Sequence, residues 1–342
     1  MKVFDCFIFF NELDLLELRL NLLNDFVDYF VIVESEITFQ GEDKEFFFEK
    51  NKKRFAKFQE KIIHFKVNKY SIDFVKLPYF QNPNNLDEKI INKIYNFLDD
   101  CNHFDKEKEP WWCNDFFQRE CIWRAIGVAN PSIGDLILLS DVDEIPNPET
   151  ILKVKRQINY DEVIYFKQHE FCYYLNYYHC SNWIGTSSFV FSELAIKSLN
   201  ALRAVAKSNK VGSLQIISNA GWHFTSMGSV AAIKNKITSW SHKEFNNSST
   251  LNNIEYNVKY GYDIFRRHGF VKLESLSVSS NILPSYLNNN PELFESMIGP
   301  DIEKEPLFQW FFYTSYFYFL SKVNGFVRRL NILKLKFQSR RK

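Results

Sequence analysis

Three acidic side chains follow a short apolar run near the middle of the chain. The apolar residues 136–139 are closely followed by Asp141, Asp143 and Glu144, and Pro146 then interrupts the pattern. Carboxylates crowded at one point repel each other unless a cation lies between them, and hard oxygen ligands suit Mg²⁺ or Mn²⁺. Such a cation can bridge to nucleotide phosphates and balance the charge of a diphosphate leaving group. The alternative is a solvated acidic turn that only favours the dipole of the next helix.

A turn of this kind needs a sheet to position it, and apolar runs alternate with helical patterns around it. Buried strands are predicted at residues 3–10, 29–33, 62–67, 136–139 and 162–166. Helices are predicted at residues 14–24, 114–128, 192–206 and 229–245, and Asn147 and Pro148 are typical of a helix start. The alternation predicts an α/β fold with a mostly parallel sheet flanked by helices. Ligands of such a sheet lie at the carboxyl ends of its strands.

The composition excludes several classes of protein. With 342 residues and 46% hydrophobic side chains, the chain can bury a core of its own, which excludes a disordered protein or a small disulfide scaffold. Basic and acidic residues balance at 42 and 41, which argues against a nucleic-acid partner. The six cysteines form no CxxC pair and predict reduced thiols. Because the first ten residues lack the features of a signal peptide, a cytoplasmic location is expected.

Five stretches of the sequence, in order, resemble one family of enzymes. Residues 138–146 resemble the DxD-type motif of glycosyltransferase family 17, and residues 10–19 resemble its amino-terminal stretch. Further similarity lies at residues 31–41, at the Gly-Trp-His-Phe phrase of residues 221–224, and at residues 241–245. The resemblance extends over about residues 3–270 and is specific because the stretches keep their order.

The resemblance implies a GT-A-like catalytic domain at residues 1–270. We expect a connecting segment at 271–306 and a helical carboxyl-terminal extension at 307–342 after it. It implies a metal-dependent, inverting transfer of a sugar, GlcNAc, from a UDP-sugar donor to a hydroxyl of a glycan acceptor. One alternative is a non-catalytic protein that binds a glycan or a nucleotide sugar on the same fold. Another is a phosphoryl or phosphodiester enzyme that uses the same acids, although the sequence has no Walker loop.

The resemblance also suggests roles for individual residues. A Mn²⁺ or Mg²⁺ ion is predicted at Asp141, Asp143 and His223, with Asp143 as the direct ligand and Glu144 orienting the turn. The alternative for His223 is a core histidine. The residues predicted to bind the donor are Asn11, Glu12, Glu34, Arg119 and Asp141. Arg119 can pair with a diphosphate through its planar guanidinium, or it can simply lie on an exposed helix face.

An inverting transfer needs a base that accepts the proton of the incoming hydroxyl. Glu244 is the first predicted base and Glu170 the second, with His242 and Asp263 as further candidates. On a continuing helix His242 and Glu244 would point in different directions, so only one of them should face the site.

Flat aromatic side chains can stack on the rings of an acceptor sugar, although core packing explains most of the abundant aromatics. Trp183 is the predicted acceptor-binding residue, because the nearby Gly185 lets a ligand approach the backbone.

The carboxyl-terminal segment has a composition of its own. Residues 307–321 carry no charge and many aromatic rings, whereas residues 322–342 carry eight basic side chains and no acidic one. The uncharged run is shorter than the ~20 residues that span a bilayer, so we predict an amphipathic segment on an anionic membrane surface. That surface would be the inner face of the cytoplasmic membrane, with a lipid-linked or lipopolysaccharide acceptor. The alternative is a docking helix or dimer contact followed by a solvated tail.

Overall fold

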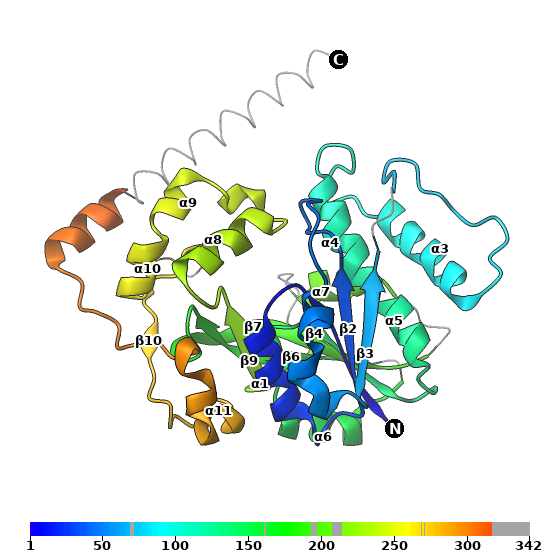
Figure 1. The fold of residues 1–342 in the computed structure, drawn as a ribbon, viewed down its shortest axis with the longest axis horizontal. Helices are drawn as coiled ribbons and strands as arrows, with labels where there is room; N and C mark the ends of the chain where they lie inside the picture. Colours follow the sequence, from blue (N-terminus) through cyan, green and yellow to red (C-terminus); the bar gives the residue numbers. More distant parts are fainter. Residues whose placement is uncertain are drawn as a thin grey trace, which may run out of the picture.

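The computed structural model describes residues 1–68, 72–160, 162–192, 197–206, 214–267, 269 and 271–316. A single ten-stranded sheet runs through this part of the chain, and helices cover it (Figure 1). The predicted carboxyl-terminal basic segment, residues 322–342, lies outside the described residues.

The amino-terminal half of the sheet is parallel. Its strand order is β3-β2-β1-β4, and all three pairs are parallel. Parallel neighbours need long crossover connections, which here contain helices. The strands are β1 (Val3–Phe9), β2 (Tyr29–Ser35), β3 (Ile62–Val67) and β4 (Leu136–Asp141). The connecting helices are α1 (Leu13–Leu23), α2 (Phe47–Asn51), the 3₁₀ helix η1 (Lys52–Phe58), α3 (Leu86–Asp99), α4 (Pro110–Glu120) and α5 (Ile122–Ala129).

Both faces of this half-sheet are covered. Along β1, Phe7 and Phe9 belong to the core that also holds the leucines of α1, whereas Phe4 and Cys6 belong to the core beneath α5. Successive side chains of a strand point to opposite faces, so an unbroken apolar run such as β1 is buried on both sides.

The carboxyl-terminal half of the sheet is mixed. It continues as β4-β7-β6-β9-β5. The chain leaves β4 at the turn that carries Asp141, Asp143 and Glu144, called the acidic turn below, and re-enters the sheet at its far edge as β5. Five of the nine strand pairs in the described chain are parallel, which confirms the predicted mostly parallel α/β sheet. The strands are β5 (Glu144–Pro146), β6 (Val163–Cys172), β7 (Tyr177–Val190), β8 (Gln215–Ile217), β9 (Gly221–Thr225) and β10 (Glu274–Ser275).

Some of the predicted helix boundaries are confirmed, and others are wrong. The Asn147 side chain accepts a hydrogen bond from the backbone N–H of Glu149 at 2.9 Å, and so caps α6 as predicted. The predicted helix 114–128 is two helices, α4 and α5, which meet at Cys121. The predicted helix 229–245 ends at Ser239. The remaining helices are α6 (Pro148–Gln157), α7 (Leu199–Ala206), α8 (Val230–Ser239), η4 (Lys243–Phe245), α9 (Ser248–Asn252), α10 (Ile254–Tyr260), α11 (Ser285–Asn289) and η5 (Pro291–Met297).

Residues 271–306, predicted as a connecting segment, pack against the main core. Leu283, Leu287 and Phe294 are buried in the same cluster as the leucines of α1. The described part of the extension, residues 307–316, is helical, and its Tyr313 is buried against Tyr256 and Tyr262. None of the helices described here has both the length and the apolar content needed to cross a membrane. All six cysteines are free thiols, as predicted.

Candidate active site

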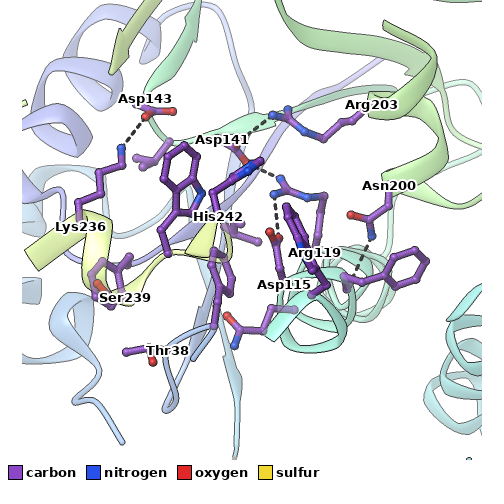
Figure 2. Close-up of a pocket in the computed structure, with 18 of the residues that line it drawn as sticks. Thr38, Asp115, Arg119, Asp141, Asp143, Asn200, Arg203, Lys236, Ser239 and His242 are labelled. Atoms are coloured by element: carbon purple, nitrogen blue, oxygen red, sulfur yellow. Dashed lines mark hydrogen bonds and ion pairs between the residues drawn. The ribbon is translucent and has the colours of Figure 1, made fainter. Parts of the chain in front are cut away.

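A pocket of about 340 Å³ opens where β1 and β4 end (Figure 2). Glu12 follows β1, Asp141 ends β4, and the turn carries Asp143 into the same pocket. His223 and Lys236 reach the pocket from β9 and α8 in the other half of the molecule. The pocket therefore lies at the carboxyl ends of parallel strands, where an α/β sheet places its ligand.

Arg19 of α1 holds the backbone of the acidic turn. Its fully buried guanidinium pairs with Asp5 of β1, with Nε 2.7 Å from Oδ2 and Nη2 2.5 Å from Oδ1. Its Nη1 donates to the carbonyl oxygens of Asp141, Val142 and Glu144 at 2.9, 3.1 and 3.1 Å. Only a planar guanidinium with several N–H donors can make so many bonds at once. Arg19 was not among the predicted site residues, although it lies within the family-like stretch 10–19.

Asp141 lies between two arginines (Figure 2). Its Oδ1 accepts a hydrogen bond from Arg119 of α4, and its Oδ2 accepts one from Arg203 of α7 at 2.7 Å. Burial acts to lower the pKa of both guanidinium groups, but Asp141 and neighbouring carboxylates outweigh it and raise the pKa of each. Arg119, predicted as a donor-binding residue, does line the pocket. Arg203 was not predicted, and the signal for it is a single charge in the otherwise uncharged stretch 199–206.

Glu144 is fully buried and ties the turn to its surroundings. Its carboxylate pairs with Arg203 at 2.7 Å and accepts hydrogen bonds from the backbone N–H of Asp141 and from Trp183 Nε1, both at 2.9 Å. Burial acts to raise the pKa of Glu144, but Arg203 outweighs it and the pKa lies below its usual value. Glu144 therefore stays ionised and orients the turn.

Asp143 directly precedes β5, and His223 lies in β9, the strand that pairs with β5. The backbone N–H of Phe224 donates to the carbonyl of Asp143 at 2.8 Å, and Lys236 Nζ lies 3.2 Å from Asp143 Oδ2. His223 Nδ1 makes no hydrogen bond to any described residue and lies 3.5 Å from Glu170 Oε1. Both residues line the pocket, and a carboxylate oxygen and an imidazole nitrogen are each ligand types for divalent metal ions.

Asp141 fits a cation less well than Asp143, since both of its oxygens already bond guanidinium groups. Within the described ranges, the ligand atoms of Asp141, Asp143 and His223 do not gather within 4.8 Å of one another. The predicted three-ligand metal set is thus not assembled in this structure.

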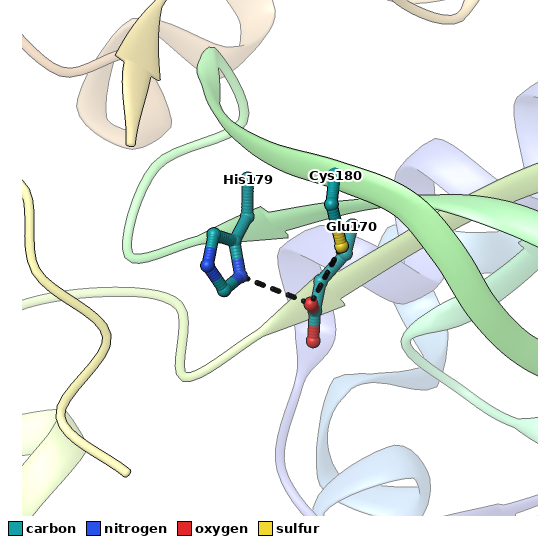
Figure 3. Close-up of side chains that lie close together, drawn as sticks. All are labelled: Glu170, His179 and Cys180. Carbon is teal, nitrogen blue, oxygen red and sulfur yellow. Dashed lines mark hydrogen bonds and ion pairs between the residues drawn. The ribbon is translucent and has the colours of Figure 1, made fainter. Parts of the chain in front are cut away.

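Glu170 is the centre of a buried cluster beside the pocket (Figure 3). Its Oε2 lies 3.1 Å from His179 Nδ1 and 3.5 Å from Cys180 Sγ, and its Oε1 lies 2.8 Å from Arg267 Nη1. Burial acts to raise the pKa of Glu170, but the contacts with His179 and His223 and the charge of Arg267 hold it well below its usual value. A carboxylate kept so firmly ionised is a poor proton acceptor. The structure therefore favours an orienting role for Glu170 over the predicted catalytic one.

The same cluster brings together side chains that could hold a metal ion. Glu170, His179 and Cys180 offer ligand atoms within 4.8 Å of one another. However, the guanidinium of Arg267 already balances the charge of the Glu170 carboxylate, so this carboxylate does not require a metal ion as a partner.

Besides Glu170 and Asp263, three residues predicted to bind the donor or to act as the base lie outside the pocket. Asn11 is exposed. Glu34 is fully buried, and its carboxylate accepts hydrogen bonds from the backbone N–H groups that begin α2, with His64 Nε2 3.0 Å away. These contacts make Glu34 a cap for the start of α2, and its buried carboxylate is not accessible to a sugar donor.

Glu244 is the third of these residues. Its side chain is 58% exposed, and its Oε1 lies 2.7 Å from His242 Nδ1. The two meet because α8 ends at Ser239 and His242 precedes a short 3₁₀ helix. Of the pair, His242 lines the pocket and Glu244 does not.

Trp183 lines the pocket but already has a partner. Its indole stacks on His223 with ring centroids 4.0 Å apart, and its Nε1 donates to Glu144. One aromatic face is therefore covered. The arrangement gives Trp183 a bracing contact that the predicted acceptor role did not foresee.

The chain matches the sequence profile of glycosyltransferase family 17 over residues 1–84 and 73–301. A match across most of the chain, on an α/β fold with a pocket at its strand ends, defines this protein as a glycosyltransferase. It belongs to glycosyltransferase family 17. The resemblance seen in the sequence is thereby confirmed. No curated protein matches the chain.

Proposed function

We propose that this glycosyltransferase has a GT-A-type site and transfers GlcNAc from UDP-GlcNAc to a hydroxyl of a glycan, with inversion at the anomeric carbon. The observation that carries the proposal is the charge of the pocket at the strand ends. Five cationic side chains line it beside the acidic turn: Lys44, Arg119, Arg203, Lys236 and Arg267. Such a lining favours a ligand with a diphosphate. The choice of GlcNAc rests on the family resemblance.

Asp143 and His223 would hold a Mn²⁺ or Mg²⁺ ion in this proposal. When bound, the ion would help to balance the charge of the departing diphosphate. Lys236 lies 3.2 Å from Asp143 and can take part in the same task. Glu170, 3.5 Å from His223 Nδ1, would orient the imidazole so that its other nitrogen faces the ion.

A binding panel of nucleotide sugars tests the donor. UDP-GlcNAc with Mn²⁺ should raise the melting temperature of the protein more than ADP-glucose or GDP-mannose does, because a ligand that binds only the folded state stabilises it. If no nucleotide sugar stabilises the protein, the proposal is wrong. Stabilisation without any release of UDP, even with glycan acceptors present, would favour the alternative of a non-catalytic binding protein.

The helix at residues 307–316 supports a further part of the proposal, which is association with an anionic membrane. Leu307, Phe308, Phe311 and Phe312 are 84%, 72%, 60% and 56% exposed, although such residues are usually buried. The sequence that follows carries eight basic side chains and no acidic one. Apolar rings next to a basic segment are typical of a protein that lies on anionic lipid. A lipid-linked or lipopolysaccharide acceptor at the inner face of the cytoplasmic membrane would suit this arrangement.

Sedimentation with vesicles tests the membrane proposal. The full chain should sediment with phosphatidylglycerol vesicles and not with phosphatidylcholine vesicles. Replacing Phe308, Phe311 and Phe312 by serine, or deleting residues 322–342, should weaken sedimentation. Replacing the exposed Val128 and Ile133 of the main body by serine is the matched control. Unchanged sedimentation of both altered proteins would refute the membrane proposal.

A further inference from the structure

We propose that an acceptor sugar ring binds against Trp112 and Trp240, and that His242 accepts the proton of its attacking hydroxyl. Glu244 is then a positioning residue that acts through His242. This inference rests on the proposed transferase function, because it assigns the acceptor side of the same pocket.

Two indole rings and one imidazole form an aromatic wall of this pocket. The centroid of the His242 ring lies 4.7 Å from that of Trp112 and 4.4 Å from that of Trp240, with interplanar angles of 84° and 60°. All three side chains are half-buried and line the pocket. Flat apolar rings with a polar nitrogen between them suit a sugar, which offers C–H groups on its faces and hydroxyls at its edge.

The loop that carries His242 is tied to the acidic turn. The buried Ser241 donates from its hydroxyl to Asp115 Oδ2 at 2.8 Å, and Asp115 Oδ1 lies 3.1 Å from Arg119 Nη2. Arg119 in turn bonds Asp141 (Figure 2). On the other side, Gln40 donates to the carbonyl of Trp240. His242 is therefore held on a loop fixed relative to the donor side, as a catalytic base must be.

The contact with Glu244 determines which nitrogen of His242 is available. Glu244 Oε1 lies 2.7 Å from Nδ1, so a neutral imidazole carries its proton on Nδ1 and leaves Nε2 as the acceptor. In the transfer step the acceptor oxygen forms a bond to the anomeric carbon, and the bond from that carbon to the phosphate oxygen breaks. The electron pair of the broken bond goes to the diphosphate. The hydroxyl proton goes to Nε2, and the carboxylate of Glu244 stabilises the imidazolium.

This assignment separates the two aromatic regions of the pocket. Trp183 has one face against His223, whereas Trp112 and Trp240 meet His242 at steep angles and not face to face. Trp240 also stacks on Phe245, with ring centroids 6.3 Å apart and 17° between the planes, so part of its surface is covered by the protein.

The acceptor site is tested by saturation-transfer difference NMR. The probes are methyl α-mannoside, methyl β-galactoside and methyl N-acetyl-β-glucosaminide, with UDP and Mn²⁺ present. Sugar C–H protons should receive saturation from the unaltered protein, and W112A or W240A should reduce the signal at least about fivefold. W111A is the matched control, since Trp111 neighbours Trp112 but is outside the pocket and packs under Lys243. Unchanged signals in W112A and W240A, or no signal in the unaltered protein, would overturn the acceptor site.

The base is tested by the rate of UDP release with the same three glycosides. H242Q should reduce kcat by a factor of about 10² to 10⁴, the usual loss for a general base, and leave UDP-GlcNAc binding within twofold. K243Q, on the exposed neighbour of His242, should retain full activity. Full activity of H242Q would overturn the assignment of the base.

The positioning role of Glu244 is tested by measuring kcat and KM separately, because a purely structural role would not change kcat alone. E244Q should lower kcat with little change in KM, and E244D should recover part of the loss because it keeps the carboxylate. Equal rates in E244Q and the unaltered protein would refute the positioning role. Failure of every nucleotide sugar to bind would instead contradict the proposed function itself, so the two failures can be distinguished.

Discussion

Trp183 lies flat against His223, with 14° between the ring planes and 4.0 Å between the ring centroids. The same indole donates a hydrogen bond to the buried Glu144. One side chain of β7 therefore braces both a residue of the acidic turn and the candidate metal ligand of β9. Because His223 and Glu144 are also opposite each other in the β5–β9 pair, a change at position 183 should affect both.

The first prediction concerns this bracing contact. W183F keeps an aromatic ring against His223 but leaves Glu144 without the indole donor. We expect a loss of about 1.5–3 kcal/mol in unfolding free energy, the usual contribution of a hydrogen bond to a charged group, together with weaker Mn²⁺ binding. Urea unfolding and Mn²⁺ titration measure the two effects. W310A, at an exposed ring of the carboxyl-terminal helix, should stay within about 0.5 kcal/mol of the unaltered protein. An equally small effect in W183F would contradict the bracing role.

The second prediction concerns Arg19. R19A leaves Asp5 buried without its partner, so we expect a loss of about 3–5 kcal/mol in unfolding free energy. R19K restores the charge but not the bonds to the turn, and should recover only part of the loss. Arg54 is the matched control: it pairs with Asp14 and Glu17 of the same helix α1, but at the surface. R54A should cost less than about 1 kcal/mol. Similar losses in R19A and R54A would refute this account of the turn.

The third prediction separates the two aspartates of the turn. D143N should weaken Mn²⁺ binding by at least about tenfold, as measured by the free Mn²⁺ signal in electron paramagnetic resonance. D141N should change Mn²⁺ affinity less, because Asp141 bonds Arg119 and Arg203, but it should lower the melting temperature. E149Q, on an exposed acid of α6, should change neither quantity. An equal loss of Mn²⁺ in D141N and D143N would restore Asp141 as a ligand.

The fourth prediction is a loss of stability in acid. The pKa of Glu170 is held below its unfolded value, which is about 4.3 for a glutamate. A depressed folded pKa stabilises the protein above the unfolded pKa, and that contribution is lost as the pH falls toward the folded pKa. Unfolding free energy should therefore decline below about pH 4.3, and the decline should be shallower in E170Q. Parallel pH profiles for E170Q and the unaltered protein would contradict this source of the decline.

The fifth prediction concerns the thiols. Burial raises the pKa of Cys113 to about 12 and that of Cys180 to about 11. Because the thiolate is the reactive form, the native protein should react slowly with Ellman's reagent at pH 8, and all six thiols should react at once in guanidinium chloride. Cys180 is the half-exposed thiol, so C180S should remove the fastest of the native reactions. Rapid reaction of several thiols in the native protein would contradict their burial.

Local pattern was enough to predict much of the fold. Unbroken apolar runs marked β1, β2 and β4, because strands buried on both faces need no polar positions. Asn147 and Pro148 marked the start of α6, because a cap depends on neighbouring residues alone. The family phrases also indicated Glu12, Asp141, Asp143 and His223, all of which line the pocket. Arg119 and Trp183, which lie outside those phrases, line it as predicted.

The missed residues depend on contacts between distant parts of the chain. Arg19 bonds carbonyl oxygens more than 120 residues away, and Arg203 reaches Asp141 from a different helix. No spacing in the sequence carries that information. Glu34 ends a strand as a donor-binding acid should, but the backbone of α2 folds over it and takes its oxygens. Glu244 and His242 were assigned to a continuing helix, and the end of α8 at Ser239 changed which of them faces the pocket.

The way in which Arg19 holds the acidic turn has a consequence for how this enzyme can diverge. Its Nη1 bonds backbone oxygens, which every amino acid supplies, so substitutions within the turn leave those three bonds in place. Positions of the turn other than Asp141 and Glu144, whose side chains make contacts of their own, can therefore change without loss of the bonds from Arg19. The guanidinium at position 19 is what descendants must keep, in a helix that never touches the substrate pocket.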